Sequence, residues 1–162
     1  MVRGFKSEQE IVAKWEEKYK VPIFTSGMTQ AAALRALGIK EFVGCTYFRD
    51  NKLNDLFTRY FSDAGFEVLA MEGMDTSPGE ADNLSTAEIY HHLKRSFLKH
   101  SHAQAIYLLG SGAWRVVDVV PAEEDLGVPV VHPVAARVWY VQKQLRVRQP
   151  IQGAGRLLLE LP

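Results

Sequence analysis

A serine between two glycines, directly after a short apolar run, is the first candidate for chemistry in this sequence. The run at residues 105–109 is typical of a buried parallel strand, and the turn Gly110-Ser111-Gly112-Ala113 follows it. Glycines let the main chain approach a ligand closely, and a helix N-terminus favours negative charge, so this turn predicts a site for a small anion. On spacing alone, the two glycines could equally serve only a tight strand-to-helix connection. Both interpretations stay open.

Three other turns are predicted to reach the same edge of the sheet, because ligands of an open α/β sheet bind outside the carboxyl ends of its strands. These turns are Thr25-Ser26-Gly27, Cys45-Thr46-Tyr47 and His132-Pro133. The candidate ligand-binding residues are therefore Thr25, Ser26, Thr46, Tyr47, Ser111, Gly112, Ala113 and His132.

A structural role explains these candidates to different degrees. Tyr47 carries a phenol of pKa about 10, so it can donate a hydrogen bond to a carboxylate without ionising, although a core or surface tyrosine is an equally good explanation. Thr25 and Ser26 stand where helix capping accounts for them fully. Cys45, the single cysteine, is expected to pack in the core rather than to react.

The histidines do not predict a metal site. His91 and His92 are adjacent on a predicted helix, so their side chains point about 100° apart. His100 and His102 follow near the end of that helix, and no carboxylate has a spacing that would complete a site with them. We expect these histidines on a solvated helix end, and we expect no metal.

Length and charge narrow the class of protein. The chain has 162 residues, with 19 Lys plus Arg balanced by 19 Asp plus Glu. That length suits one well-buried core, and the balanced charge creates no field that would draw the chain to nucleic acid or to an anionic membrane. There is no apolar signal segment, and no run approaches the roughly 20 apolar residues of a membrane span. We therefore expect a cytoplasmic protein with no nucleic-acid or membrane partner.

Strands and helices are predicted to alternate along the chain. Short apolar runs predict strands at residues 21–24, 41–46, 66–71, 105–109 and 128–131. Helical spacing predicts helices at 7–19, 26–37, 53–64, 85–99, 113–126 and 134–145, with a polar loop at 72–84. Capping boxes are expected at Ser7 with Glu10 and at Ser85 with Glu88, helix stops at Gly38 and Gly65, and a kink at Pro121. This order predicts an α/β fold, a parallel sheet sandwiched by helices in a Rossmann-like (flavodoxin-like) lobe.

Two groups of residues carry a family resemblance. The first is Thr46-Tyr47 after a strand, then Asn54, Phe61 and Gly65-Phe66-Glu67-Val68. The second is Ser111-Gly112-Ala113, Asp118-Val119-Val120-Pro121, Glu123, Leu126-Gly127-Val128-Pro129-Val130, and Ala135 with Trp139. In this order and spacing, which cover most of residues 22–145, they resemble the aspartate/glutamate racemase superfamily, and within it the arylmalonate decarboxylases and maleate cis-trans isomerases.

The resemblance implies two similar lobes that face each other, with one catalytic cysteine from each lobe on opposite sides of a small carboxylate. It implies proton transfer at carbon, or thiolate addition in the isomerase, without a metal or an organic cofactor. It also implies that Tyr47 hydrogen-bonds the carboxylate of the substrate. Counting back from Asp118 places Ser111 at the second cysteine position, and the first cysteine would precede residue 1.

Serine at a cysteine position changes the available chemistry. A thiol of pKa about 8.5 can be tuned to a thiolate near neutral pH, whereas a serine hydroxyl needs a neighbouring base. His132 is the one candidate base at the strand ends. Ser111 could instead donate a hydrogen bond to a bound carboxylate, or it could be a replacement, natural or engineered, that silences the site.

Three hypotheses for function follow. The chain could be a racemase, isomerase or decarboxylase that works without a cofactor. It could be a catalytically silent protein that binds a small mono- or dicarboxylate or has a regulatory role, or it could be a truncated fragment of a two-lobe enzyme. The resemblance divides the chain into a remnant of the first lobe (1–38; helix, strand, helix), an α/β ligand-binding lobe (39–150) and a C-terminal tail packing on the first part (151–162). A missing lobe would expose apolar surface, so we expect a homo-oligomer.

Overall fold

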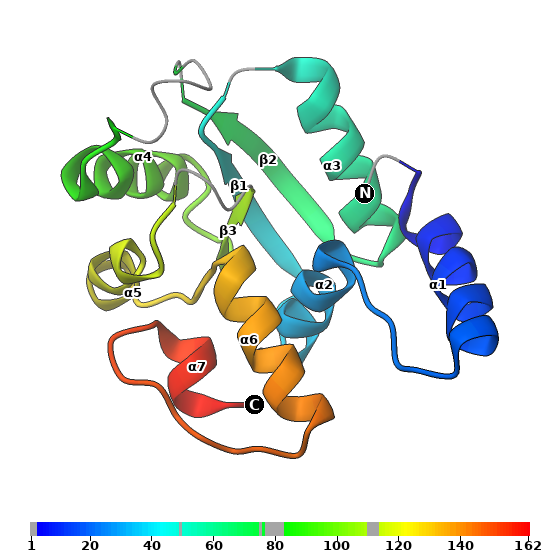
Figure 1. Ribbon diagram of the computed structural model, residues 1–162. Coiled ribbons are helices and arrows are strands. Elements are labelled where there is room, and N and C mark those ends of the chain that lie inside the picture. Colours follow the sequence, from blue (N-terminus) through cyan, green and yellow to red (C-terminus); the bar gives the residue numbers. More distant parts are fainter. Residues whose placement is uncertain (1–2, 49, 75, 77–82, 110–113) are drawn as a thin grey trace.

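The computed structural model of the chain describes residues 3–48, 50–74, 76, 83–109 and 114–162 (Figure 1). Within these residues, parallel pairing joins four strands in the order β2-β1-β3-β4. The strands are β1 (Glu41–Thr46), β2 (Glu67–Gly73), β3 (Ile106–Leu109) and β4 (Val130–Val131). The predicted α/β class is confirmed, since each pair of consecutive strands is joined through a helix, as a parallel sheet requires.

Helices cover both faces of this sheet. The α-helices of the described residues are α1 (Phe5–Tyr19), α2 (Ser26–Ala36), α3 (Asn51–Asp63), α4 (Thr86–Lys99), α5 (Val120–Leu126), α6 (Pro133–Gln144) and α7 (Arg156–Glu160). Of these, α1 packs mainly on α3 and α7 mainly on α6. Phe42 and Tyr107 point to a core that α2, α3 and α6 supply with Leu34, Phe61 and Trp139. Val43 and Ile106 point to the other core, which α4 and α5 complete with Ile89 and Ala122. The alternation of strand side chains thus produces the predicted sandwich (Figure 1).

The strand predicted at residues 21–24 is wrong. This segment has no strand partner and forms an irregular connection from α1 to α2. Pro22 has no N–H to donate, and the N–H of Ile23 donates to the Glu16 carboxylate of α1 at 2.9 Å. The segment therefore closes the end of α1 instead of extending the sheet.

The capping box predicted at Ser7 is also wrong, because α1 begins two residues earlier. Gly4 precedes the helix with φ +82°, a conformation that glycine adopts without strain, and no side chain caps α1. The earlier start buries Phe5, whose ring meets Tyr60 of α3 edge-on at 5.4 Å. The capping box at Ser85 and Glu88 is confirmed in both of its hydrogen bonds.

The helix predicted from residue 113 to 126 is shorter than expected. A 3-10 turn at Val116–Asp118 comes first, and α5 begins at Val120. Pro121 lies in the first turn of α5, where its missing N–H leaves no hydrogen bond unmade, so it starts the helix and does not kink it.

Helix α7 was not expected from the sequence. Its first N–H, from Arg156, donates to the Glu123 carboxylate of α5 at 2.8 Å, and Leu157 and Leu158 pack into the same core as Trp139. A Cβ atom added to Gly155 (φ +85°) would stand 3.2 Å from the Glu123 Oε2 atom. Glycine is therefore required where the chain approaches this buried carboxylate.

Candidate ligand-binding edge of the sheet

The carboxyl ends of the strands form one level edge. Thr46, the last residue of β1, pairs with Gly73 of β2 on one side and with Leu109 of β3 on the other. Tyr47 continues directly from this edge, and His132 follows β4. The sheet thus brings the predicted turns after β1 and β4 to the edge where α/β folds bind ligands.

Trp114 connects the ends of the strands. Its indole Nε1 donates to the carbonyl of Leu109 at 2.9 Å, and its own carbonyl accepts from His132 Nε2 at 2.8 Å. Its ring meets Tyr47 edge-on with centroids 6.0 Å apart, and it stacks on His92 of α4 at 6.4 Å with an interplanar angle of 8°. Since Trp114 is only 2% exposed, these contacts form a buried support beneath the edge.

His132 is fully buried and caps α6. Its Nδ1 accepts from the N–H of Val134 at 3.0 Å, while its Nε2 donates to the carbonyl of Trp114. The acceptor role of Nδ1 and the donor role of Nε2 assign the neutral tautomer with its proton on Nε2. A general base needs a free lone pair, and here that lone pair is already hydrogen-bonded to α6. A substrate-binding role for His132 stays a prediction.

Thr46 and Tyr47 offer different groups at the edge. Thr46 is fully buried, and its hydroxyl donates to the carbonyl of Phe48 at 2.7 Å, so it shapes the turn after β1. The half-buried ring of Tyr47 is held edge-on between Phe48 and Trp114. Within the part of the chain that the structure describes, no group hydrogen-bonds the Tyr47 hydroxyl. Tyr47 therefore combines a fixed ring with an available donor.

The two hydroxyls at the start of α2 have different partners, and only Thr25 caps the helix. Thr25 Oγ1 accepts from the N–H of Met28 at 3.2 Å, as helix capping predicts. Ser26 Oγ accepts from Gln30 Nε2 at 2.8 Å, and Gln30 Oε1 in turn accepts from the hydroxyl of Tyr107 on β3. This chain of hydrogen bonds ties α2 to the sheet and leaves the O–H of exposed Ser26 as a donor.

Gly110, Ser111, Gly112 and Ala113 lie outside the described residues. Their predicted place at the carboxyl end of β3, and the roles predicted for Ser111, Gly112 and Ala113, therefore stay predictions.

The thiol of Cys45 is buried just below the edge. Its side chain is 0% exposed, and burial raises the pKa of the thiol to about 12; the nearby Ser96 hydroxyl opposes this rise, and the Glu72 carboxylate adds to it. A thiol with such a pKa holds its proton at neutral pH and is a poor nucleophile. The structure supports the packing role expected for Cys45.

His92 is not on a solvated helix end, contrary to expectation. It is 3% exposed in the middle of α4, and its Nε2 donates to the carbonyl of Glu72 on β2 at 3.1 Å. Burial lowers the pKa of His92 to about 4. The signal that could have placed it is its spacing from Ile89 and Ser96, since positions i, i+3 and i+7 share one helix face.

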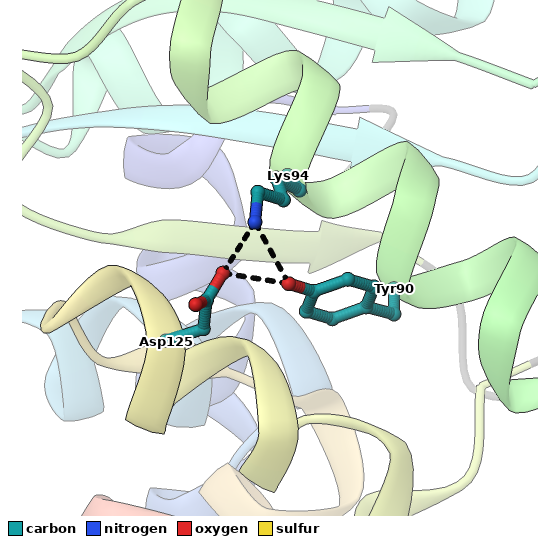
Figure 2. Close-up of polar contacts among 3 residues, drawn as sticks. All are labelled: Tyr90, Lys94 and Asp125. Atoms are coloured by element: carbon teal, nitrogen blue, oxygen red, sulfur yellow. Dashed lines mark hydrogen bonds and ion pairs between the residues drawn. The ribbon is translucent and has the colours of Figure 1, made fainter.

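Tyr90, Lys94 and Asp125 hold α5 against α4 (Figure 2). Asp125 accepts from the Tyr90 hydroxyl at 2.6 Å and from Lys94 Nζ at 2.7 Å, and Lys94 also donates to Tyr90 at 3.0 Å. The Lys94 ammonium, followed by the Tyr90 hydroxyl, lowers the pKa of Asp125. Asp125 is exposed, and Lys94 and Tyr90 are half-buried, so this triad positions two helices at the surface and does not form a pocket for chemistry.

Two negative findings hold for the described ranges. No group of three or more His, Cys, Asp or Glu side chains is arranged to hold a metal ion there. No helix there has both the length and the apolar character needed to cross a membrane.

A family model described as arylmalonate decarboxylase matches residues 1–158 of the chain. No curated protein matches the sequence. Neither finding depends on the structure, and the first covers nearly the whole chain.

Solved structures of two kinds share the fold. A crystal structure of arylmalonate decarboxylase has a TM-score of 0.89 at 20% identity, covering 99% of this chain and 71% of that one. The maleate isomerase Iso from Pseudomonas putida S16 has a TM-score of 0.81 at 20% identity, covering 96% of this chain and 63% of that one. A cysteine-to-serine mutant of Nocardia farcinica maleate cis-trans isomerase, with a covalently bound succinylcysteine intermediate, has a TM-score of 0.84 at 20% identity. This match covers 98% of the present chain and 66% of the isomerase chain.

Proposed function

Because the chain belongs to the arylmalonate decarboxylase family, within the aspartate/glutamate racemase superfamily, we propose that it binds a small mono- or dicarboxylate at the carboxyl edge of its sheet. The observation that carries this proposal is Tyr47: its ring is fixed between Phe48 and Trp114, and its hydroxyl is free to donate within the described residues. A phenol donates a hydrogen bond to a carboxylate and stays protonated at neutral pH. Ser26, the exposed first residue of α2, is proposed as a second hydroxyl donor, because Gln30 links it to Tyr107 of β3.

The names of the similar solved proteins support a carboxylate as the ligand class. Arylmalonate decarboxylase is named for a dicarboxylic acid, and the Nocardia isomerase structure holds a succinyl group on cysteine. Preformed donors at a sheet edge can hold such an acid and can also stabilise negative charge that develops when a carbon acid loses CO2 or a proton. Tyr47 is the residue that we assign to this role. We propose Ser111, which the resemblance places at a cysteine position, as a further donor; the alternative that this serine silences the site stays open.

Thiolate chemistry is not part of the proposal. Cys45 is the only cysteine in the sequence, and its buried thiol keeps its proton. A cysteine that attacks the ligand, or donates a proton to it, must have a thiol that reaches the carboxyl edge. The buried thiol of Cys45 does not reach it. We therefore favour the carboxylate-binding role over a thiol-dependent racemase or isomerase.

Binding can be tested with maleate, aspartate and phenylmalonate, each titrated into the 15N-labelled protein and followed by NMR. We expect saturable shifts at Tyr47 and its neighbours for at least one acid. Tyr47→Phe should weaken that binding roughly tenfold, the loss expected for one hydrogen bond to a charged acceptor. Tyr19→Phe, a change at an exposed tyrosine of α1, is the matched control and should bind as the parent does.

Two outcomes would contradict the proposal: no saturable binding of any of the three acids, or equal affinity of Tyr47→Phe and the parent. Release of CO2 from phenylmalonate and conversion of maleate can be followed in the same samples. Turnover that disappears in Cys45→Ala would restore the thiol-dependent hypothesis.

Self-association stays a prediction that α1 supports. Trp15, Tyr19 and Val21 are 48%, 57% and 52% exposed, respectively, so the end of this helix presents apolar side chains to solvent. Light scattering after size exclusion should give a mass above 18.2 kDa, and a monomer would contradict the prediction.

A further inference from the structure

A second candidate site lies far from Tyr47, at the C-terminal end of α6. Helix α6 starts beside the carboxyl edge and runs back along the sheet, so its last turn lies toward the opposite edge (Figure 1). A hollow of about 370 Å³ is found there. Its apolar lining is Trp139, Val147, Leu161 and Pro162, and its polar lining is Gln142, Lys143, Arg146 and Arg148. The volume falls within the usual range for small-molecule sites, about 300–1,000 Å³.

Contacts within the chain hold two of the three cations at this hollow. Lys143 Nζ lies 4.9 Å from the centroid of the Trp139 ring, a cation–π arrangement. Arg148 Nη2 donates to the carbonyl of Leu161 at 3.2 Å. A ligand that used these two side chains would therefore order less of the surface on binding, which favours affinity.

None of these three cations is neutralised by a carboxylate in the described part of the chain. The ion pairs of that part involve other cations: Lys94, Lys99, His100 and Arg156. The helix dipole accounts for Lys143 in the last turn of α6, but Arg146 and Arg148 lie beyond the helix. The carboxyl group of Pro162 also lines the hollow, and its oxygen accepts from Trp139 Nε1 at 3.2 Å. Three positive charges outnumber this single negative group, so the potential in the hollow is positive and favours an anion.

Arg146 occupies a position that favours glycine. It follows α6 with φ +55°, and the N–H groups of Arg146 and Val147 close the helix by donating to the carbonyls of Lys143 and Gln142. Such closing turns take glycine at the left-handed residue because any Cβ atom there is strained. An arginine at this position adds a cation to the hollow at a cost in stability.

Gln142 completes the polar lining. Its Oε1 accepts from the N–H of Gln149 at 3.0 Å, which fixes the orientation of the amide. Its NH2 group then remains as a donor beside Lys143 and Arg146. The hollow thus combines three positive charges and an amide donor with an apolar floor.

We propose that this hollow binds a small anion that carries more than one negative charge, such as a phosphate group or a polycarboxylate, with any apolar part of the ligand on the floor made by Trp139 and Leu161. The site is separate from the carboxyl edge and does not rest on the function proposed for it. A concave site with an apolar floor favours a small molecule over an extended polyanion.

Inorganic phosphate is the first probe, titrated into the full-length 15N-labelled protein at constant ionic strength. We expect saturable shifts confined to residues 139–148 and the end of α7. Arg146→Gly keeps the left-handed turn and removes one charge, so it should fold at least as well as the parent and bind phosphate roughly fivefold more weakly. Lys143→Gln should weaken binding similarly. Arg59→Gln, at an exposed arginine of α3, is the control and should leave the affinity unchanged.

Three results would overturn the proposal. The first is a response to phosphate that does not saturate or that spreads over the whole surface, as weak ion screening would. The second is equal affinity in Arg146→Gly and the parent. The third is binding of a single-stranded oligonucleotide through the same residues at far lower concentration than phosphate or citrate, which would make this a nucleic-acid surface. Citrate that binds more tightly than phosphate would support the proposal and identify polycarboxylates as the ligand class.

Discussion

The indole N–H of Trp114 donates to the carbonyl of Leu109 across 2.9 Å, so one buried hydrogen bond joins the last residue of β3 to the first described residue after the 110–113 segment. Leu109 is 4% exposed and Trp114 is 2% exposed, so both partners of this bond are shielded from solvent. The bond therefore holds Trp114 against the carboxyl end of β3.

Trp114→Phe should destabilise the fold by about 1–3 kcal/mol, because it leaves the buried carbonyl of Leu109 without its donor. Trp114→Ala should cost more, about 3–5 kcal/mol, since it also empties the space between Tyr47 and His92. Urea unfolding followed by circular dichroism measures both. Trp15→Phe, at a tryptophan that is 48% exposed, is the control and should change stability by less than about 0.5 kcal/mol. Equal effects of the two phenylalanine variants would contradict this role of Trp114.

The parts of the fold that the sequence predicts well are those set by local signals. Strand β1 was expected at residues 41–46 and is found there, because a run of apolar residues follows a glycine stop. Gly38 and Gly65 both adopt positive φ after α2 and α3, as helix-terminating glycines do. The strand expected at 21–24 failed because the Glu16 carboxylate, from the preceding helix, binds its backbone. No pattern within four residues reveals that competition.

At the candidate ligand-binding edge, too, local features could be predicted from the sequence and long-range contacts could not. Tyr47 and Thr46 could be placed from the end of a strand, which is a local feature. The roles of Trp114 and His92 could not, because each depends on partners about 20 residues away in sequence: Trp114 accepts from His132, and His92 donates to Glu72. Long-range contacts of this kind are visible only once the strands are ordered in the sheet.

Cys45 should react slowly with a thiol reagent in the folded protein. Its buried thiol has a pKa raised to about 12, whereas a free cysteine has a pKa of about 8.5 and reacts readily at pH 8. We expect Ellman's reagent to modify the native protein far more slowly than the protein unfolded in about 8 M urea. In the unfolded protein, one thiol per chain should react. Rapid reaction under native conditions would mean that Cys45 reaches the surface.

Acid should destabilise the protein through His92. Its folded-state pKa of about 4 lies below the ordinary value of 6.5, mainly because burial disfavours the charged ring, while the bond to Glu72 opposes that effect and Arg95 adds to it. The unfolded chain therefore binds a proton more readily than the folded chain, so the contribution of His92 is fully present above pH 6.5 and is lost as the pH falls toward 4. The loss should approach about 3 kcal/mol at the acid end.

The control for His92 removes its titration and keeps its donor. His92→Gln can still donate to the carbonyl of Glu72, so the difference in unfolding free energy between parent and variant should shrink as the pH falls from 7 to 4, in the range that separates the two pKa values. His91→Gln, at an exposed neighbour, should follow the parent at every pH. A pH-independent difference for His92→Gln would show that this ring does not titrate between those limits.

Glu123 should make stability fall as the pH rises. Its carboxylate is 7% exposed and accepts from the N–H groups of Val130 at 2.7 Å and Arg156 at 2.8 Å. Burial raises the pKa of Glu123, and these two hydrogen bonds lower it by less, so the folded state holds this proton more tightly than the unfolded state. The contribution is therefore complete below the ordinary pKa of 4.5 and declines as the pH rises through the folded-state pKa.

Glu123→Gln separates the hydrogen bonds from the charge. Glutamine has a single acceptor oxygen, so one of the two buried N–H groups loses its partner, and the variant should be less stable by about 1–3 kcal/mol at pH 4.5. Because glutamine does not titrate, the gap between parent and variant should narrow as the pH is raised toward 8. Glu124→Gln, at the exposed neighbour, should show neither effect. Thermal unfolding of the three proteins at matched ionic strength measures this, and a gap that widens with pH would mean that the ionised carboxylate is the form that α7 and β4 stabilise.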